Sequence, residues 1–280
     1  MAQGQRAGNQ AQCLLHQKFQ GGIAKRVAPS GRRVADRAGK NVTATRRRKR
    51  GRSVKVNSVH EVALHQRRAS DCFRFLSACF CQPQMKLYQE EHLLDHLTED
   101  LRQISPGADL FSASMATFIQ MYSEEDLSVE YARLFLGPFE TQAPPYGSLY
   151  LNGEKRVMGD STMEVIRFYE AAGLSRDKDC MDLPDHIAVE LEFMSYLIYQ
   201  EAEALEKSDY TTALDLMKKQ ERFLDQFLGR WITVFCEKIT ASTDNDFYFA
   251  LADCTSRFVT NYNPRHAIEK LGEEVFLAAP

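Results

Sequence analysis

Apolar side chains recur every three or four positions through most of the chain after about residue 59. This spacing puts them on one face of an α-helix, which can then pack against other helices. The clearest sets are Leu93-Leu97-Leu101-Ile104, Phe111-Met115-Phe118-Tyr122, Leu127-Tyr131-Phe135, Leu224-Leu228-Trp231-Phe235 and Phe247-Leu251-Phe258. Runs with the alternating pattern of a β-strand are almost absent. The pattern therefore predicts an all-α fold.

Several helix ends can also be predicted from short polar motifs. Ser123-x-x-Asp126 and Ser161-x-x-Glu164 both resemble capping boxes, which mark helix N-termini. Gly173 follows an apolar periodic run at the position of a C-terminal capping glycine. Pro184-Asp185 is expected to open a long helix that runs to about Lys207, since proline and aspartate both suit a first turn.

The charge of the chain is divided unevenly between two regions. Residues 1–70 contain 17 Lys or Arg but only two acids, for a net charge of +15, whereas the rest carries 18 Lys or Arg and 36 Asp or Glu, for −18. Residues 1–57 show no sustained apolar periodicity, and the basic run at 46–50 repels itself. The sequence predicts a disordered basic extension at 1–57 and a single globular helical domain at 58–280.

The basic extension has two readings. It could be an arm for a nucleic acid or another anionic surface, or an upstream extension outside the folded domain. No aromatic residues interleave the basic run at 46–50, as a single-strand binder would prefer, which favours the second reading and predicts no nucleic-acid partner. Arg32-Arg33 is followed by no apolar stretch, so it does not resemble an export leader.

Hydropathy and cysteine usage indicate where the protein works. No apolar run approaches the roughly 20 residues that cross a bilayer, so stable membrane insertion is not expected. The N-terminus lacks the apolar core of a secretory signal. The seven cysteines are odd in number and form no CxxC pair, which is typical of a reducing compartment. We therefore expect a cytoplasmic protein in which Cys79 and Cys81 are packing residues.

Catalytic signatures are missing or incomplete. His92 and His96 share a helix face with Asp95 nearby, a spacing compatible with a metal ion, and an all-helical metal-dependent hydrolase is the alternative function. Residues 153–162 only faintly resemble a phosphate loop, because an aspartate stands where the lysine is needed. The leucines at 93, 97 and 101 define the buried side of the helix, which leaves both histidines on a solvated flank. We expect no enzyme activity, no metal and no cofactor.

Two other segments stand out within the helical region. The first is EYARLFLGP at 130–138, followed by APPYGSLY at 143–150, in a long stretch rich in Gly and Pro. Tyr146 is braced by two prolines and offers an apolar ring with a hydroxyl, which suits contact with a peptide. The same residues could equally pin a loop to the core.

The second segment is LPDHIAVELEFM at 183–194. His186 and Glu190 are one helical turn apart and can meet as a hydrogen-bonded pair. With Asp185 they could form an acidic corner that receives arginine side chains, since guanidinium groups pair well with fixed carboxylates. The alternative is a helix cap beside a structural histidine.

These segments, in this order and about 45 residues apart, resemble the TorD/DmsD family of molybdoenzyme chaperones. The likeness rests on Tyr-x-Arg-Leu-Phe-x-Gly-Pro at 131–138, Pro-Pro-x-x-Ser-x-Tyr at 144–150, Pro-Asp-His-Ile at 184–187 and Glu-Leu-Glu-Phe-Met at 190–194. Weaker likeness extends over about residues 60–272. Some family members place tryptophan in the loop where this chain has Tyr146, and the basic extension is not a family feature.

The resemblance implies a TorD-like all-α domain without catalysis or a bound cofactor. It implies binding of the twin-arginine leader and the apo catalytic subunit of a molybdenum-cofactor oxidoreductase, with help in cofactor insertion and proofreading before export. The client enzyme stays open, and both a monomer and a homodimer fit. The peptide-binding residues carried over from these motifs are Pro145, Tyr146, Pro184, Asp185, His186, Glu190 and Arg133.

Overall fold

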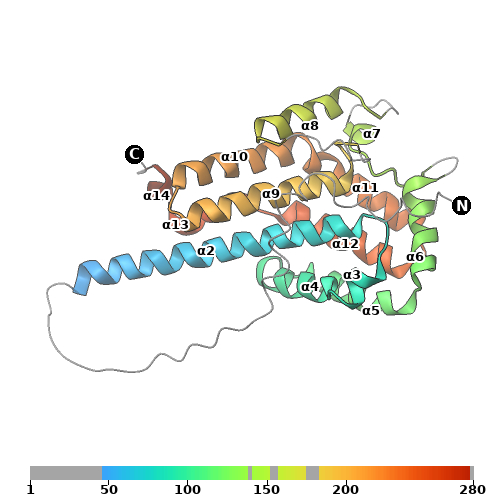
Figure 1. The fold of residues 1–280 in the computed structure, drawn as a ribbon, viewed down its shortest axis with the longest axis horizontal. Helices are drawn as coiled ribbons and strands as arrows, with labels where there is room; N and C mark the ends of the chain where they lie inside the picture. Colours follow the sequence, from blue (N-terminus) through green and yellow to red (C-terminus); the bar gives the residue numbers. More distant parts are fainter. Residues whose placement is uncertain (1–45, 138–140, 152–156, 175–182, 278–280) are drawn as a thin grey trace, which may run out of the picture.

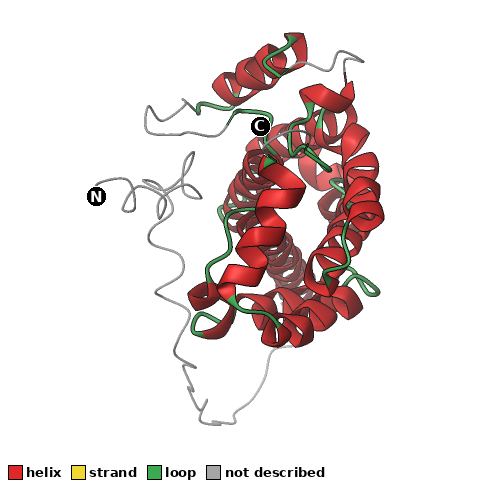
Figure 2. Cartoon of the chain, turned by 90° about the vertical axis from the view of Figure 1, so that its right-hand side faces the viewer, coloured by secondary structure: helices red, strands yellow, loops and turns green. Residues whose placement is uncertain are grey.

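The computed structural model describes residues 46–137, 141–151, 157–174 and 183–277, with side chains from residue 58 onward. This part of the chain is built of helices (Figures 1 and 2). They are α2 (Arg46–Cys79), α3 (Met85–Gln89), α4 (Leu93–Ile104), α5 (Asp109–Phe118), η2 (Ile119–Met121), α6 (Glu124–Tyr131), η3 (Ala132–Leu136), α7 (Ser148–Leu151), α8 (Asp160–Ala171), α9 (Ile187–Glu206), α10 (Tyr210–Gln226), α11 (Leu228–Ser242), α12 (Asp246–Asn261), α13 (His266–Leu271) and α14 (Glu273–Leu277). The described residues contain no β-strand and one isolated bridge, which confirms the predicted all-α class.

Helix α9 forms the centre of the fold, with α2 and α10 along its sides (Figure 1). It is buried on nearly every face, as expected of a helix that is apolar almost all round. Side-chain hydrogen bonds fix α2 against it: Ser77 Oγ donates to the Ala188 carbonyl at 2.7 Å, and Ser70 Oγ donates to the Ser195 carbonyl at 2.8 Å. These two bonds therefore fix the position of the start of α9 along α2.

A smaller apolar cluster closes the opposite end of α9. Side chains of α2, α9, α10, α13 and α14 pack there, among them Val62, Leu205, Met217, Ile268 and Phe276. The C-terminal helices thus cover the far end of the bundle, away from the start of α9.

The predicted helix ends agree with the structure in two cases and differ in two. Ser123 and Asp126 form the predicted capping box, and Gly173 ends α8 with a φ of +80°. The prediction for Ser161 was wrong, because this residue lies inside α8, which starts at Asp160. The prediction for Pro184-Asp185 was also wrong by one turn: α9 begins at Ile187, because the ring of His186 caps it.

The N-terminal boundary can be compared with the structure only in part. Helix α2 already begins at Arg46, before the boundary predicted at residue 57, while residues 1–45 lie outside the described residues. Extending an existing helix costs less than nucleating one, and Arg and Lys are good helix formers. The division into 1–57 and 58–280 stays a prediction. Among the described helices, none is both long and apolar enough to span a membrane.

Candidate functional site

The two segments singled out in the sequence lie side by side at the start of α9. Tyr146 and His186 form an antiparallel bridge. The Gly147 N–H donates to the Asp185 carbonyl at 2.8 Å, and the Ile187 N–H donates to the Pro145 carbonyl at 2.9 Å. This bridge ties the loop before α7 to the first turn of α9. We call the residues around it, 144–150 with 183–190, the bridge corner.

Asp185 holds the N-terminus of α7. Its Oδ2 accepts a hydrogen bond from the Ser148 N–H at 2.9 Å, and the side chain is only 1% exposed. A carboxylate at a helix N-terminus meets backbone donors that have no partner within the helix. Asp185 therefore stabilises the start of α7, whereas the sequence had predicted it in the first turn of α9.

His186 caps α9 through its ring. Its Nδ1 accepts a hydrogen bond from the Ala188 N–H at 3.2 Å, and its ring packs edge-on against that of Tyr146 at 5.4 Å. Burial lowers the pKa of His186 to about 4, so the ring is neutral at pH 7. The predicted side-chain pair between His186 and Glu190 was wrong, because Nδ1 is used by the cap and the Glu190 carboxyl points to another partner.

That partner is the only tryptophan of the chain. Trp231 Nε1 donates to Glu190 Oε2 at 2.9 Å, and neither side chain is exposed. Burial, with a smaller contribution from the charge of Asp185, raises the pKa of Glu190 well above its usual range, because a buried site disfavours the charged carboxylate. A Cβ on Gly147 would lie 3.0 Å from Trp231 Nε1 and 3.2 Å from Glu190 Oε1, so any larger residue would require these side chains to shift.

Two further helices cover the bridge corner. The hydroxyl of Tyr169 on α8 donates to the Pro184 carbonyl at 2.9 Å. The ring of Tyr150 on α7 stacks on Trp231 at 5.3 Å, and its hydroxyl donates to the Pro144 carbonyl at 2.9 Å. Pro145 and Pro184 are buried beneath this cover, while Tyr146 stays partly exposed.

The sequence had not assigned Gly147, Tyr169 or Trp231 to the site. For Trp231 a signal existed, since a buried indole N–H needs an acceptor and a buried carboxyl such as Glu190 needs a donor. No signal in the sequence alone pairs residues 41 positions apart.

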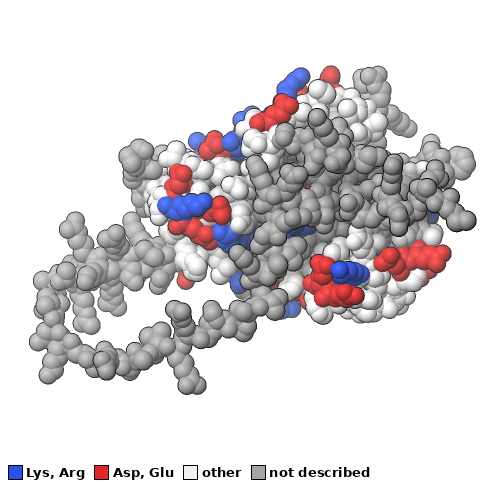
Figure 3. Space-filling model, viewed as in Figure 1, with Lys and Arg blue, Asp and Glu red and all other residues white. Residues whose placement is uncertain are grey.

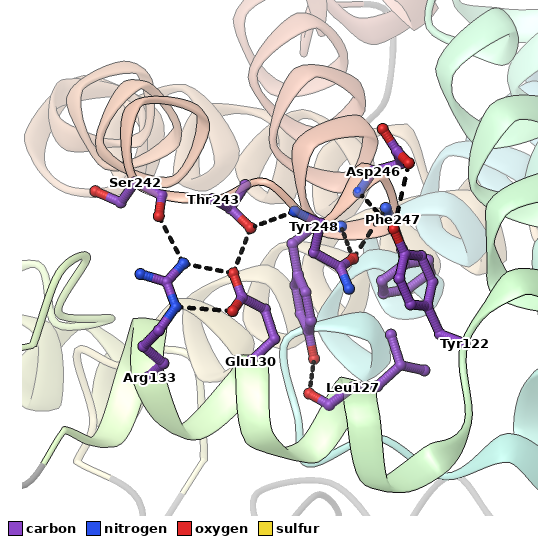
Figure 4. A network of polar contacts seen from close by, with 10 residues as sticks. Tyr122, Leu127, Glu130, Arg133, Ser242, Thr243, Asp246, Phe247 and Tyr248 are labelled. Carbon is purple, nitrogen blue, oxygen red and sulfur yellow. Dashed lines mark hydrogen bonds and ion pairs between the residues drawn. The ribbon is translucent and has the colours of Figure 1, made fainter.

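Arg133 lies in a different network (Figure 4). Its guanidinium donates to both carboxylate oxygens of Glu130, at 2.6 and 2.8 Å, and to the Ser242 carbonyl at 2.6 Å. Glu130 also accepts from the hydroxyl of Thr243. These bonds connect α6 and η3 to the segment between α11 and α12, and none of them reaches the bridge corner.

The histidines considered for a metal site lie on the surface. His92 is the exposed N-cap of α4, with a φ of +52°, and contacts Asp95 at 3.2 Å. The ring of His96 lies beside that of Phe75. In the described ranges, no group of three or more His, Cys, Asp or Glu side chains is placed to hold a metal ion. Cys79 and Cys81 are buried, as predicted.

Comparison with known proteins identifies the family whose sequences this chain resembles. Residues 101–237, which contain the bridge corner, match the family described as nitrate reductase delta subunit. A chaperone protein TorD from Photobacterium profundum is 32% identical over 45% of this chain and 56% of its own length. The chain belongs to the TorD/DmsD family. The predicted membership is thus confirmed.

Two other relatives also match part of this chain. A perchlorate reductase assembly chaperone protein from Dechloromonas aromatica is 28% identical, over 61% of this chain and 76% of its own length. A Tat proofreading chaperone DmsD from Salmonella typhimurium is 29% identical, over 41% of this chain and 56% of its own length. The chain thus spans little more than half of the TorD and DmsD relatives.

Proposed function

We propose that this TorD/DmsD-family protein is a non-enzymatic maturation chaperone. It binds the twin-arginine leader and the apo catalytic subunit of a molybdenum-cofactor oxidoreductase, assists cofactor insertion and proofreads the precursor in the cytoplasm before export. One observation carries the proposal: the two family segments, 37 residues apart at Ser148 and Asp185, meet in one corner that gathers two buried carboxyls and a partly exposed aromatic ring. The relatives named above are all chaperones, which supports it.

The chemistry of the bridge corner fits a peptide with arginines and apolar side chains. Tyr146 presents a ring whose position is fixed by His186, and rigid aromatic rings grip peptides at low entropic cost. Asp185 and Glu190 are acceptors for a guanidinium group. Acidic side chains also form groups on the face shown in Figure 3, and such a surface attracts a basic leader.

Arg133 is left out of the proposed leader site. Three hydrogen bonds already occupy its guanidinium within the fold, which makes it a brace between α6 and the α11–α12 connection. The alternative of a metal-dependent hydrolase finds no support in the described residues, because His92 and His96 lie with no third metal-ligating side chain in place.

The proposal is tested by titrating the full chain with synthetic twin-arginine leaders encoded near its gene, using calorimetry. We expect dissociation constants in the micromolar range or tighter. An Arg-Arg→Gln-Gln peptide removes both charges and is expected to bind at least about tenfold more weakly, since hydrogen bonds to charged groups contribute about 1.5–3 kcal/mol. A folded protein that binds none of the leaders would contradict the proposal. Light scattering of the same samples would distinguish the monomer from the homodimer.

A further inference from the structure

The bridge corner and the start of α8 contain side-chain oxygens that make no hydrogen bond within the described part of the fold. Among the described residues, four buried side-chain oxygens have no hydrogen-bond partner. They are Ser148 Oγ, Thr162 Oγ1, Asp185 Oδ1 and Glu190 Oε1. Buried polar atoms are nearly always hydrogen-bonded, so four orphans among so few residues call for a physical reason.

These oxygens come from elements that pack on one another. Asp185 already binds the Ser148 N–H through its other oxygen, and Glu190 Oε1 lies 3.2 Å from the Cβ position of Gly147, the residue next to Ser148. Thr162 is on α8, which contacts α7. It shares the buried face of α8 with Tyr169, whose hydroxyl is bonded to the Pro184 carbonyl.

The chemistry of the set points to a ligand that donates several hydrogen bonds and carries positive charge. Two of the oxygens belong to carboxyl groups and two to hydroxyls, all of which can accept. In the described part of the chain, no Lys or Arg forms an ion pair with Asp185 or Glu190. A guanidinium offers five N–H groups in a planar fork, whereas an ammonium offers three from one point.

All four residues are closed off from solvent. Ser148, Thr162 and Glu190 are fully buried, and Asp185 is 1% exposed. A cation therefore reaches these oxygens only when α7 and α8 move away from the start of α9. Two hydrogen bonds hold this cover in place, from the Ser148 N–H to Asp185 and from the Tyr169 hydroxyl to Pro184.

We propose that α7 and α8 form a cover that moves outward just far enough to admit one guanidinium group, which Ser148 and Thr162 on the displaced cover then accept together with Asp185 and Glu190. This inference rests on the proposed function and deepens it by adding two specificity-determining hydroxyls and a closed resting state. The two hydroxyls then have opposite effects in the two states: unpaired, they destabilise the closed state, and paired with the ligand they favour the bound one.

The first experiment uses a small probe, so that it does not depend on finding the client. Thermal unfolding of the full chain is followed with argininamide and, in parallel, with lysinamide. We expect argininamide to raise the Tm of the wild type more than lysinamide does. Ser148→Ala and Thr162→Val are expected to raise the Tm without a ligand by about 2–4 °C each, since an unpaired buried hydroxyl is removed. Both should lose most of the shift caused by argininamide.

Thr255→Val is the matched control. Thr255 is also fully buried, but its hydroxyl donates to the Leu251 carbonyl at 2.7 Å. This variant should lower the Tm slightly and keep the argininamide shift. Variants of Ser148 and Thr162 that are more stable but respond to argininamide like the wild type would overturn the inference, because the hydroxyls would then only hold a resident water.

Opening is tested with the single tryptophan. Trp231 is fully buried under Tyr150 in the closed state, so acrylamide should quench its fluorescence weakly. With saturating argininamide or, once found, a bound leader, quenching is expected to rise at least about twofold if the cover has opened. Unchanged quenching at a saturating ligand concentration would contradict the proposed opening of the cover. Failure of every leader to bind, with both argininamide effects present, would contradict the proposed function and leave the guanidinium site standing.

Discussion

The indole N–H of Trp231 donates to Glu190 Oε2 at 2.9 Å and thereby joins α11 to the first turn of α9 inside the bridge corner. The carboxyl is buried, and burial raises its pKa above the usual range. A glutamine keeps an oxygen for Trp231 and has no charge, so it copies the uncharged form of the acid, which burial favours.

Glu190→Gln should therefore fold with a Tm within about 2 °C of the wild type, since the neutral hydrogen bond is retained. Its affinity for a twin-arginine leader should fall at least about tenfold, because no carboxylate can form when the cation enters. Calorimetry and thermal unfolding measure both effects. A large loss of Tm with unchanged affinity would assign Glu190 a structural role alone.

Gly147→Ala should destabilise the bridge corner through the steric contact of its added Cβ atom. Its Cβ would lie 3.0 Å from Trp231 Nε1, and this backbone position does not have a positive φ. We expect a loss of about 1–3 kcal/mol in the free energy of unfolding, typical of overpacking, measured by urea titration. Gly173→Ala is the comparison, since it meets open space but has a φ of +80° and should lose about 1 kcal/mol from backbone strain. If the two variants changed the affinity for the leader by the same factor, a role of the bridge corner in leader binding would be contradicted.

Tyr169→Phe should have opposite effects on stability and binding. It removes the hydroxyl that donates to the Pro184 carbonyl and leaves the ring in the core. Loss of this bond should lower the free energy of unfolding by about 1 kcal/mol. If α8 covers the site, opening becomes easier and leader affinity should rise about two- to fivefold, since binding no longer includes breaking that bond. An affinity that falls together with stability would contradict the cover.

Arg133→Lys tests whether the family motif around residue 133 contacts the ligand. Lysine keeps the charge but cannot reproduce the bidentate pair with Glu130 or reach Ser242 in the same geometry. We expect a loss of stability of about 1 kcal/mol or less, because the side chain is 44% exposed, and a leader affinity within about twofold of the wild type. A tenfold loss of affinity would return Arg133 to the leader site.

The contribution of two carboxyls, Glu192 and Glu201, to stability should fall as the pH rises towards 7. Glu201 is fully buried and accepts hydrogen bonds from Gln66 and Gln220, and among the described residues no Lys or Arg forms an ion pair with it. Burial raises the pKa of Glu201 from 4.5 to about 7, and burial likewise raises that of Glu192 to about 7. The folded chain thus holds protons that the unfolded chain has lost between pH 4.5 and 7, so this contribution is complete below pH 4.5 and lost as pH rises through about 7.

Urea titrations between pH 5 and 8 measure this slope. The free energy of unfolding of Glu201→Gln, taken relative to the wild type at each pH, should rise between pH 5 and 7, since the variant lacks the contribution of Glu201. A slope unchanged in this variant would mean that Glu201 does not titrate there. His186 and His266 act in the opposite direction. Burial lowers the pKa of each to about 4, so below pH 6.5 the unfolded chain binds protons that the folded chain does not, and this favours unfolding.

The fold class followed from local pattern alone. Helices such as α4 and α12 were predictable because each buries one face whose residues repeat every three or four positions, and the capping box at Ser123 needs only neighbours in the chain. The family was also accessible, because its motifs are short runs of sequence. Ser161 and Pro184 were misassigned as helix starts, since a capping motif does not show which partner its side chain will find in the folded chain.

The sequence by itself thus determined that the chain is helical and which family motifs it carries, and the resemblance predicted Pro145, Tyr146, Pro184, Asp185, His186 and Glu190 for the leader site. Only the tertiary structure decided how they act. It paired Asp185 with α7, Glu190 with Trp231 and Arg133 with Glu130, and it closed the carboxyls off beneath α7 and α8. The reason is that burial and hydrogen-bond partners come from contacts between residues far apart in the chain, and local spacing carries no information about them.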